Sequence, residues 1–262
     1  MSGTTIRPDD PFLRIPIEVR LQIYSLLLTN HDQQTISIRT EHASLWELRK
    51  HESRRRTKYR HMADRFRART MESTYHLLQN PGIHASILCT NRQIHIEASD
   101  VLYSHHIFDF GTDIESIVPF FSDLTPTALS SVKRISLLKR ALPYTKDFDR
   151  CEWGNACAFI SQNMKLAQLD LMIEGGKPES KWESRETYCK EDFELIADFD
   201  GMEWARPVSA IKGLEVLNVK AHLEHCPSPM NSKAIAFFVD FSASIERGFA
   251  DWLRGKMVVG AA

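Results

Sequence analysis

Residues 166–171, LAQLDL, place leucine at the first, fourth and sixth positions of a short segment. The same spacing of apolar residues recurs at residues 132–137, VKRISL, and at residues 214–219, LEVLNV. Alternate residues of a β-strand point to the same face of a sheet, so each copy predicts a strand with one buried face. Helices are predicted between the copies, at residues 145–163 and 191–199. This alternation of strand and helix favours parallel pairing with helices on a face of the sheet.

The spacing of the three copies matches the strand segment of a leucine-rich repeat. The copies begin 34 and then 48 residues apart, which is longer and less even than the roughly 20–29 residues of a regular repeat. The position usually held by Asn or Cys contains Arg140, Glu174 and His222. The sequence therefore predicts an irregular β/α layer rather than a regular horseshoe. Residues 232–257 predict a long amphipathic helix that packs on this layer.

Two apolar segments precede the layer. Residues 11–28, PFLRIPIEVRLQIYSLLL, predict a helix that begins at Pro16, because the fixed φ of proline suits the first turn. One apolar face of this helix would consist of Val19, Ile23, Leu26 and Leu27, widened by Tyr24 and Leu28. Residues 87–110, ILCTNRQIHIEASDVLYSHHIFDF, predict a second buried helix followed by a strand at 106–110. Alternating apolar residues predict a further strand at 34–40.

A basic insertion, residues 41–69, separates the two segments. Within it, residues 49–69 contain ten Lys and Arg against Glu52 and Asp64, a net charge of +8, although the whole chain has a net charge of −1. The insertion has few apolar residues, so it predicts a charged, exposed helix. Residues 71–78 regain an apolar face and predict a helical continuation.

Three interpretations of the basic segment stay open. It could bind nucleic-acid phosphates or an acidic partner. It could be a solvated segment with no partner. It could also pair with residues 174–203 of the same chain, whose net charge is −6. The candidate residues for binding are Arg54, Arg55, Arg56, Lys58 and Arg60.

Composition limits the class of protein. The chain has 262 residues, of which 43% are hydrophobic and 26% charged, as in ordinary globular proteins. No apolar run approaches the roughly 20 residues of a membrane-spanning helix. The first ten residues are polar and do not form a secretory signal, and five cysteines do not suggest a disulfide framework. We expect an intracellular protein, in the cytoplasm or the nucleus, with no membrane contact; its oligomeric state is left open.

The sequence has no pattern that indicates an enzyme. Gly175 and Gly176 form a lone glycine pair, interpreted as a turn, without the other residues of a phosphate-binding loop. The best metal candidates are His222, His225 and Cys226 on a predicted loop, but structural zinc usually requires four ligands at paired spacings. We therefore expect no catalytic residues, no metal and no cofactor; a hydrolase is the third alternative. Small core residues are expected at Cys89, Cys151 and Cys157.

The two N-terminal motifs together resemble an F-box-like domain of filamentous fungi, a domain of unknown function. The first motif, LRIPIEVRLQIYSLLL, is similar to the Leu-Pro-x-Glu opening of an F-box. The second, CTNRQIHIEASDVLY, is similar to the Cys-Arg-Gln-Ile segment that follows in that family. Ile15 replaces the usual leucine. Nearly sixty residues separate the motifs here, whereas the helices of an ordinary F-box are contiguous.

The resemblance implies a non-enzymatic protein-interaction module, an F-box-like substrate receptor of a cullin ubiquitin ligase. Its β/α half would hold a target protein. The positions that would contact a Skp-type adaptor are Leu13, Pro16, Ile17, Val19, Ile23 and Leu27. Alternatively, these side chains form the internal core of the domain. The second candidate function is a nucleic-acid or acidic-partner binding protein that acts through residues 49–69.

The expected fold is mixed α/β. An F-box-like helical region, residues 1–110, would carry the basic insertion at 41–69. It would pack on an irregular β/α region, residues 111–262, with a long helix at its C-terminal end. The two regions would form one continuous globular unit.

Overall fold

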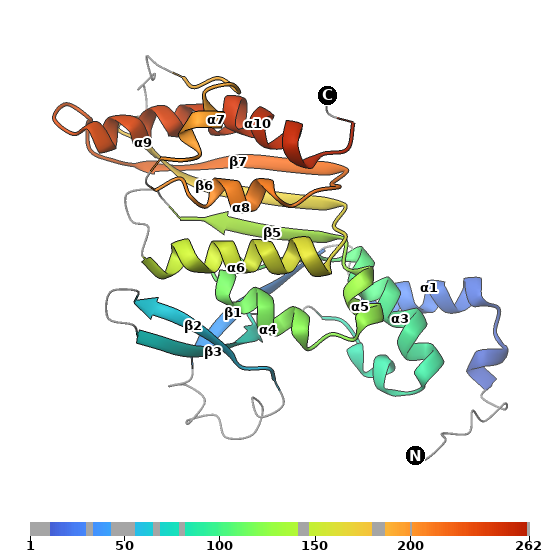
Figure 1. Cartoon of the computed structure of the whole chain (residues 1–262). Helices are drawn as coiled ribbons and strands as arrows, with labels where there is room; N and C mark the ends of the chain where they lie inside the picture. Colours follow the sequence, from blue (N-terminus) through green and yellow to red (C-terminus); the bar gives the residue numbers. More distant parts are fainter. Residues whose placement is uncertain are drawn as a thin grey trace.

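The computed structural model describes residues 11–29, 34–42, 56–64, 69–78, 82–140, 147–179, 187–199 and 201–260. The fold is mixed α/β, as the sequence predicts, with helices packed on a seven-stranded sheet (Figure 1). The strands are β1 (Thr35–His42), β2 (Tyr59–Asp64), β3 (Arg69–Leu77), β4 (Ile107–Asp109), β5 (Arg134–Lys139), β6 (Gln168–Lys177) and β7 (Val216–His225). The helical segments are η1 (Pro11–Arg14), α1 (Ile17–Leu28), η3 (Ala85–Cys89), α3 (Arg92–His105), η4 (Ile114–Ser116), α4 (Ile117–Ser122), α5 (Pro126–Ser131), α6 (Asp147–Asn163), α7 (Phe193–Ile196), α8 (Ala205–Ser209), α9 (Lys233–Ser244), η6 (Ile245–Phe249) and α10 (Ala250–Met257).

The three repeated apolar patterns form β5, β6 and β7, which are adjacent and parallel. The strand order is β2-β3-β1-β4-β5-β6-β7, and β1 and β4 extend the parallel part of the sheet. Helix α6 connects β5 to β6, and α7 and α8 lie between β6 and β7 in the chain. The predicted irregular β/α layer is therefore confirmed, although the helix predicted at 191–199 is only the single turn α7.

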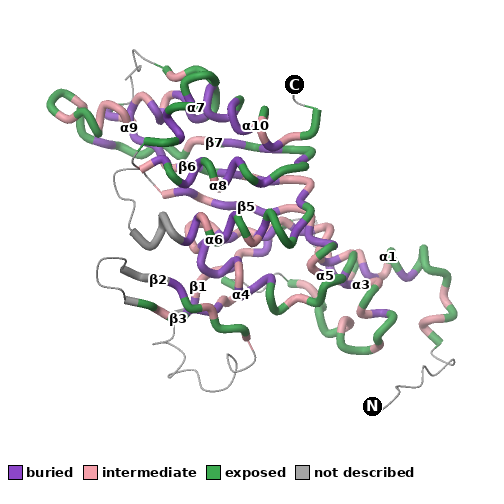
Figure 2. Tube along the Cα trace, viewed as in Figure 1, coloured by how far each residue is buried: buried purple, intermediate pink, exposed green. Residues whose placement is uncertain are grey.

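One face of the parallel sheet carries the core. In Figure 1, α4, α6 and α8 lie in front of this face, and in Figure 2 buried residues concentrate along β5 to β7 and the helices that pack on them. The side chains that point to this face are the apolar residues of the repeated pattern. They include Ile135, Leu137, Leu169, Leu171, Leu217 and Val219, each at most 5% exposed.

The basic insertion does not form the predicted helix. Its described part forms β2, and residues 71–78, also predicted as a helix, belong almost entirely to β3. The two strands form an antiparallel hairpin, and β3 pairs with β1 so that Thr40 lies opposite Tyr75. The run from Thr70 to Tyr75 contains β-branched and aromatic residues, which favour a strand when a neighbouring strand is available. That neighbour, β1, lies more than thirty residues earlier in the chain.

The second N-terminal helix begins later than predicted. The second helix, α3, begins at Arg92, because the side chain of Asn91 accepts a hydrogen bond from the Gln93 amide at 2.8 Å and caps the helix there. The residues before it form η3, and Cys89 in η3 is exposed rather than buried. The predicted strand that follows α3 is confirmed as β4.

The predicted long C-terminal helix is broken into α9 and α10 by the π-helical segment η6. Arg247 within this segment has non-helical dihedral angles, φ −112° and ψ −105°. The break lets the Glu246 carboxylate accept the main-chain N–H of Ala221 at the outer edge of β7, at 2.9 Å. Gly248 packs against the main chain of Tyr188 and Cys189, so a side chain at this position would not fit. These contacts protect the edge of the sheet at β7.

Gly175 and Gly176 lie inside β6 and do not form the predicted turn. A Cβ atom at Gly176 would overlap the Phe238 ring of α9. The Gly176 amide also donates to the Ser242 hydroxyl at 2.8 Å. The glycine pair therefore allows α9 to lie directly on the strand.

Candidate functional site

An ion pair joins the two motifs that the sequence analysis separated. The Arg20 guanidinium of α1 donates from Nη2 to Glu97 Oε1 of α3 at 2.7 Å and from Nε to Oε2 at 2.9 Å. The side chains are only 7% and 11% exposed. Tyr24 donates its hydroxyl to Glu97 Oε2 at 3.0 Å. A bidentate pair of this kind fixes the relative orientation of the two helices.

These contacts shift the pKa values of Glu97 and Tyr24. The hydrogen bonds from Arg20 lower the pKa of Glu97 to about 2. Burial, together with the hydrogen bond to the Glu97 carboxylate, raises the pKa of Tyr24 to about 12. Arg20 also donates to the main-chain oxygens of Ile15 at 2.5 Å and Leu13 at 3.2 Å, so it holds the chain that leads into α1. Glu97 is therefore a charged, structural residue.

The face of α1 that packs inward matches the predicted one only in part, at Tyr24 and Leu28. Arg20, Tyr24 and Leu28 are buried and recur at four-residue steps, so they form the stripe that packs on the rest of the protein. Val19 is 42% exposed and Leu26 is 78% exposed, on the opposite side. Helix α1 therefore buries an arginine beside Tyr24 and Leu28 and exposes aliphatic side chains on the opposite side, which partly reverses the polarity of an ordinary surface helix.

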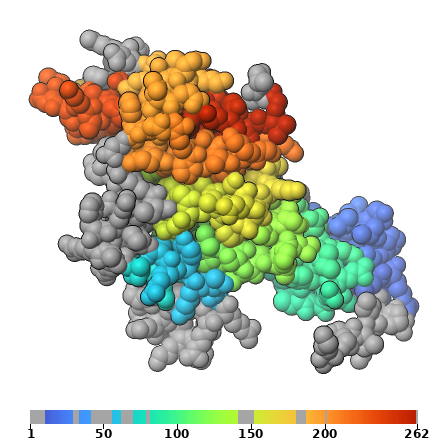
Figure 3. All heavy atoms as spheres, viewed as in Figure 1, coloured from blue at the N-terminus to red at the C-terminus, as the bar shows by residue number. Residues whose placement is uncertain are grey.

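The predicted adaptor-contacting residues all lie at one end of the molecule, where α1 is at the surface (Figure 3). Pro16, Ile17 and Val19 are exposed, with Ile17 at 46%. Leu13, Ile23 and Leu27 are half-buried. The sequence analysis did not select two further exposed residues of the same helix for this surface, Leu21 and Leu26. The adaptor face is defined here as Val19, Ile23 and Leu26, which share the side of α1 opposite the buried stripe, whereas Ile17 and Leu21 lie elsewhere around the helix.

The basic candidates are only partly placed. Arg54 and Arg55 lie outside the described residues. Arg56 donates to the main-chain oxygen of Tyr75 at 2.5 Å, and its guanidinium lies 5.0 Å from the centre of the Tyr75 ring. Its Nη1 atom is 3.9 Å from the buried carboxylate of Glu41. Arg56 therefore stabilises the hairpin from within, while Lys58 and Arg60 are exposed near the start of β2.

The second face of the parallel sheet carries polar side chains. Five neighbouring strands each contribute one residue to a row across this face, because their pairing places these residues side by side. The row consists of Ser37, Asp109, Ser136, Asp170 and Asn218. We refer to it as the polar row and to this side of the sheet as the open face.

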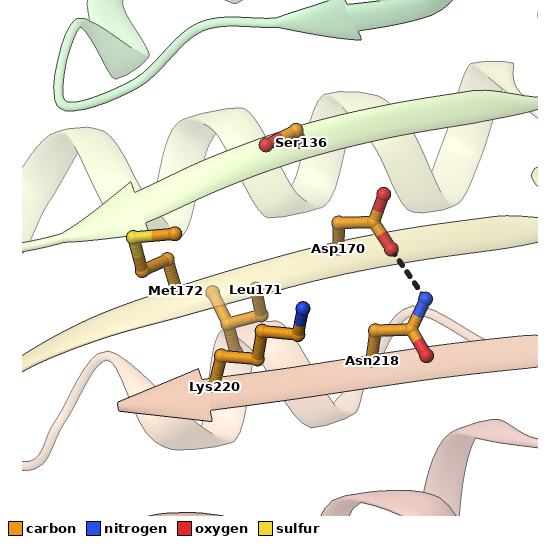
Figure 4. Close-up of a pocket in the computed structure, with 6 residues that line it drawn as sticks. All are labelled: Ser136, Asp170, Leu171, Met172, Asn218 and Lys220. Carbon is orange, nitrogen blue, oxygen red and sulfur yellow. Dashed lines mark hydrogen bonds between the residues drawn. The ribbon is translucent and has the colours of Figure 1, made fainter. Parts of the chain in front are cut away.

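A hollow of about 370 Å³ lies at one end of the polar row (Figure 4). Its lining residues come from β5, β6 and β7: Ser136, Asp170, Leu171, Met172, Asn218 and Lys220. Asp170 accepts hydrogen bonds from Asn218 Nδ2 at 2.7 Å and from Gln168 Nε2 at 2.9 and 3.0 Å. These bonds fix the orientation of the carboxylate, and the Lys220 ammonium lies on the same side of the sheet.

Sequence reasoning missed the polar row, although a signal was present. In each of the three repeated patterns the fifth position is polar, and these positions are Ser136, Asp170 and Asn218. Because that position lies between two core-facing residues, it must point to the opposite face of the strand. Once the three strands are parallel and adjacent, the three side chains form a row.

The described residues give no sign of a metal centre. No group of three or more His, Cys, Asp or Glu could hold an ion in the part of the chain that the structure describes. His222 and His225 lie in β7 rather than on a loop, and Cys226 is buried. Cys157 is a core residue, as expected, and burial raises the pKa of its thiol to about 12. The side chain of Cys151 lies outside the described residues.

The described helices are also too short or too polar to span a bilayer.

The fold and these surfaces define a mixed α/β protein with an apolar helix exposed at one end and a parallel sheet open on one face. A family model described as a domain of unknown function, DUF7730, matches residues 7–198. The chain belongs to this family, and the matched region contains both N-terminal motifs. No curated protein and no solved structure matches the chain.

Proposed function

We propose that this protein is a non-enzymatic protein-interaction module that binds a Skp-type adaptor through α1 and acts as an F-box-like substrate receptor of a cullin ubiquitin ligase. The observation that carries the proposal is the partly reversed polarity of α1, which buries Arg20 and exposes Val19 and Leu26. The resemblance of the two motifs to an F-box-like domain supplies the identity of the adaptor.

The apolar side chains of α1 argue for a partner. Four aliphatic residues of this 12-residue helix are at least 38% exposed: Ile17, Val19, Leu21 and Leu26. Single exposed apolar residues need no explanation, but Val19 and Leu26, with the half-buried Ile23 between them, lie on one side of the helix, and such a cluster is typical of an interaction surface. Burying such a cluster contributes about 25 cal/mol for each Å² of apolar surface removed from water, which favours association.

The ion pair beneath α1 supports the same conclusion. Arg20, Tyr24 and Glu97 hold α1 on α3 by three short hydrogen bonds, so the adaptor face is fixed before any partner binds. A rigid surface loses less conformational entropy on binding than a mobile one. The buried pair, together with Leu28, therefore orients α1 and leaves Val19 and Leu26 exposed.

Adaptor binding should depend on the exposed aliphatic residues. We expect the doubly substituted variant Val19→Asp with Leu26→Asp to weaken binding to a purified fungal Skp-type adaptor by at least about 100-fold, because two charges would be buried without partners. Isothermal titration calorimetry measures the dissociation constants of the variant and of the unmodified protein. The matched control is Gln162→Asp, an exposed polar position on α6, which should bind as the unmodified protein does. The proposal fails if the unmodified protein does not bind at tens of micromolar, or if the double variant binds equally well.

A further inference from the structure

The open face of the sheet is unusual for parallel strands. Parallel sheets are normally covered on both faces, and their strands are apolar on both sides. Here the described residues leave one side accessible: Met172 is 38% exposed and Val216 44% exposed. We propose that the open face binds an extended polypeptide segment of a partner protein, and that the Asp170 carboxylate receives a basic side chain of that segment. The inference rests on the proposed function and names the chemistry of the target.

The protein itself shows how a basic side chain is bound on this face. Asp109 lies in the polar row two strands from Asp170. The Arg39 guanidinium of β1 donates to Asp109 Oδ2 at 2.8 Å and to the main-chain oxygen of Asp109 at 2.9 Å. The first acid of the row is therefore neutralised by an arginine from the same chain.

Hydrogen bonds also hold the Asp170 carboxylate in place, but they do not come from an arginine. Its three hydrogen bonds come from the neutral amides of Gln168 and Asn218. No Lys or Arg among the described residues forms an ion pair with it. The carboxylate is thus oriented and open to the hollow in Figure 4. A guanidinium from a partner can form the charge-assisted pair that Arg39 forms with Asp109.

The other residues that line the hollow favour a polypeptide over a nucleic acid or an apolar ligand. Lys220 offers a donor for a carbonyl or carboxylate group, and Asn218 and Ser136 offer further polar atoms. An extended polypeptide presents both N–H and C=O groups beside its side chain, so it can satisfy both kinds of partner. A nucleic-acid backbone would place phosphates near the Asp170 carboxylate, which repels them because no arginine neutralises it as Arg39 neutralises Asp109. An apolar ligand would leave Asp170 and Lys220 desolvated without partners.

The test uses the whole protein and a defined peptide library. The library consists of fluorescent heptapeptides with a central arginine and randomised neighbours, and its counterpart has citrulline, a neutral isostere, at the centre. We expect the best arginine peptides to bind with dissociation constants below about 100 μM and about ten-fold more tightly than their citrulline counterparts, because one charge-assisted pair is lost. Asp170→Asn should remove this ten-fold preference. Glu215→Gln, an exposed acid just before β7, is the matched control and should retain it.

Three results overturn the inference. Two of them are that no peptide is enriched, or that arginine and citrulline peptides bind the unmodified protein and Asp170→Asn equally. The third is a dimer in sedimentation velocity that Met172→Asp, on the open face, dissociates, because a second copy of this chain would then cover the face. The double variant Val19→Asp with Leu26→Asp should still bind the arginine peptides, because α1 is not part of the open face. Failure of adaptor binding and failure of peptide binding are therefore separate outcomes.

Discussion

The substitution Glu97→Ala is expected to lower the free energy of unfolding by about 3 kcal/mol, because it leaves a buried guanidinium and the Tyr24 hydroxyl without their acceptor. Arg20 and Tyr24 are 6% and 0% exposed, so water cannot replace the lost carboxylate easily. Urea unfolding followed by circular dichroism measures the change. Arg92→Ala, at an exposed position on the same helix, is the matched control and should change stability by no more than about 0.5 kcal/mol.

The ion pair between Arg20 and Glu97 also predicts how the free energy of unfolding depends on pH. The pKa of Glu97 falls from an ordinary 4.5 to about 2 in the folded protein. A lowered carboxyl pKa means that the stabilisation is complete above about pH 4.5 and is lost as the pH falls towards 2. The difference in unfolding free energy between the unmodified protein and Glu97→Gln should therefore shrink over this interval. A difference that stays constant down to pH 2 would show that the pair is not ionised in the folded protein.

The second large effect concerns Glu115, whose pKa is raised, whereas that of Glu97 is lowered. Glu115 lies in η4, is 6% exposed, and its Oε2 atom has no hydrogen-bond partner among the described residues. Burial, with the nearby charge of Asp113, raises its pKa to about 7. A raised carboxyl pKa means that stability is fully present below about pH 4.5 and is lost as the pH rises through 7.

Glu115→Gln should therefore stabilise the protein at neutral and alkaline pH. At pH 8 the folded protein must bury a charged Glu115, whereas the neutral glutamine has no such cost, so we expect the variant to be about 3 kcal/mol more stable than the unmodified protein at pH 8 and equal to it at pH 4. Thermal or urea unfolding across pH 4–8 gives both values. The control is Glu215→Gln, which changes an exposed acid and should leave the pH profile unaltered. Equal stabilities of the two proteins at pH 8 would contradict the raised pKa of Glu115.

The strands of the parallel sheet could be predicted because their information is local. The pattern apolar-x-x-apolar-x-apolar already states which side chains face the core, and β5, β6 and β7 follow it. The hairpin of the basic insertion could not be predicted in the same way. Its strand character depends on β1, a partner distant in sequence, whereas its charges are compatible with an exposed helix.

The inward face of α1 depends on a contact that the sequence cannot reveal. Val19, Ile23 and Leu26 have the spacing of a buried face, and only the presence of Glu97, 77 residues after Arg20, turns the arginine inward instead. The break between α9 and α10 has a similar cause, because Glu246 reaches an amide of β7. In both places a polar contact between residues distant in sequence determines the structure, and the apolar pattern of the sequence does not reveal that contact. The division of the chain at residue 110 stays a prediction; the sheet includes strands from both sides of it.

The central claim is that the aliphatic side chains of α1 face solvent in the free protein and are covered by the adaptor. Thiol labelling tests it directly, with Leu26→Cys as the probe and Leu28→Cys as its buried counterpart on the same helix, at 78% and 0% exposure. Both substitutions are made after the exposed Cys89 and Cys189 have been replaced by serine. We predict that the thiol at position 26 reacts at least about 100-fold faster than the one at position 28 in the free protein, and that saturating adaptor slows it at least about ten-fold. Slow labelling at position 26 in the free protein, or labelling that the adaptor does not change, would contradict the account.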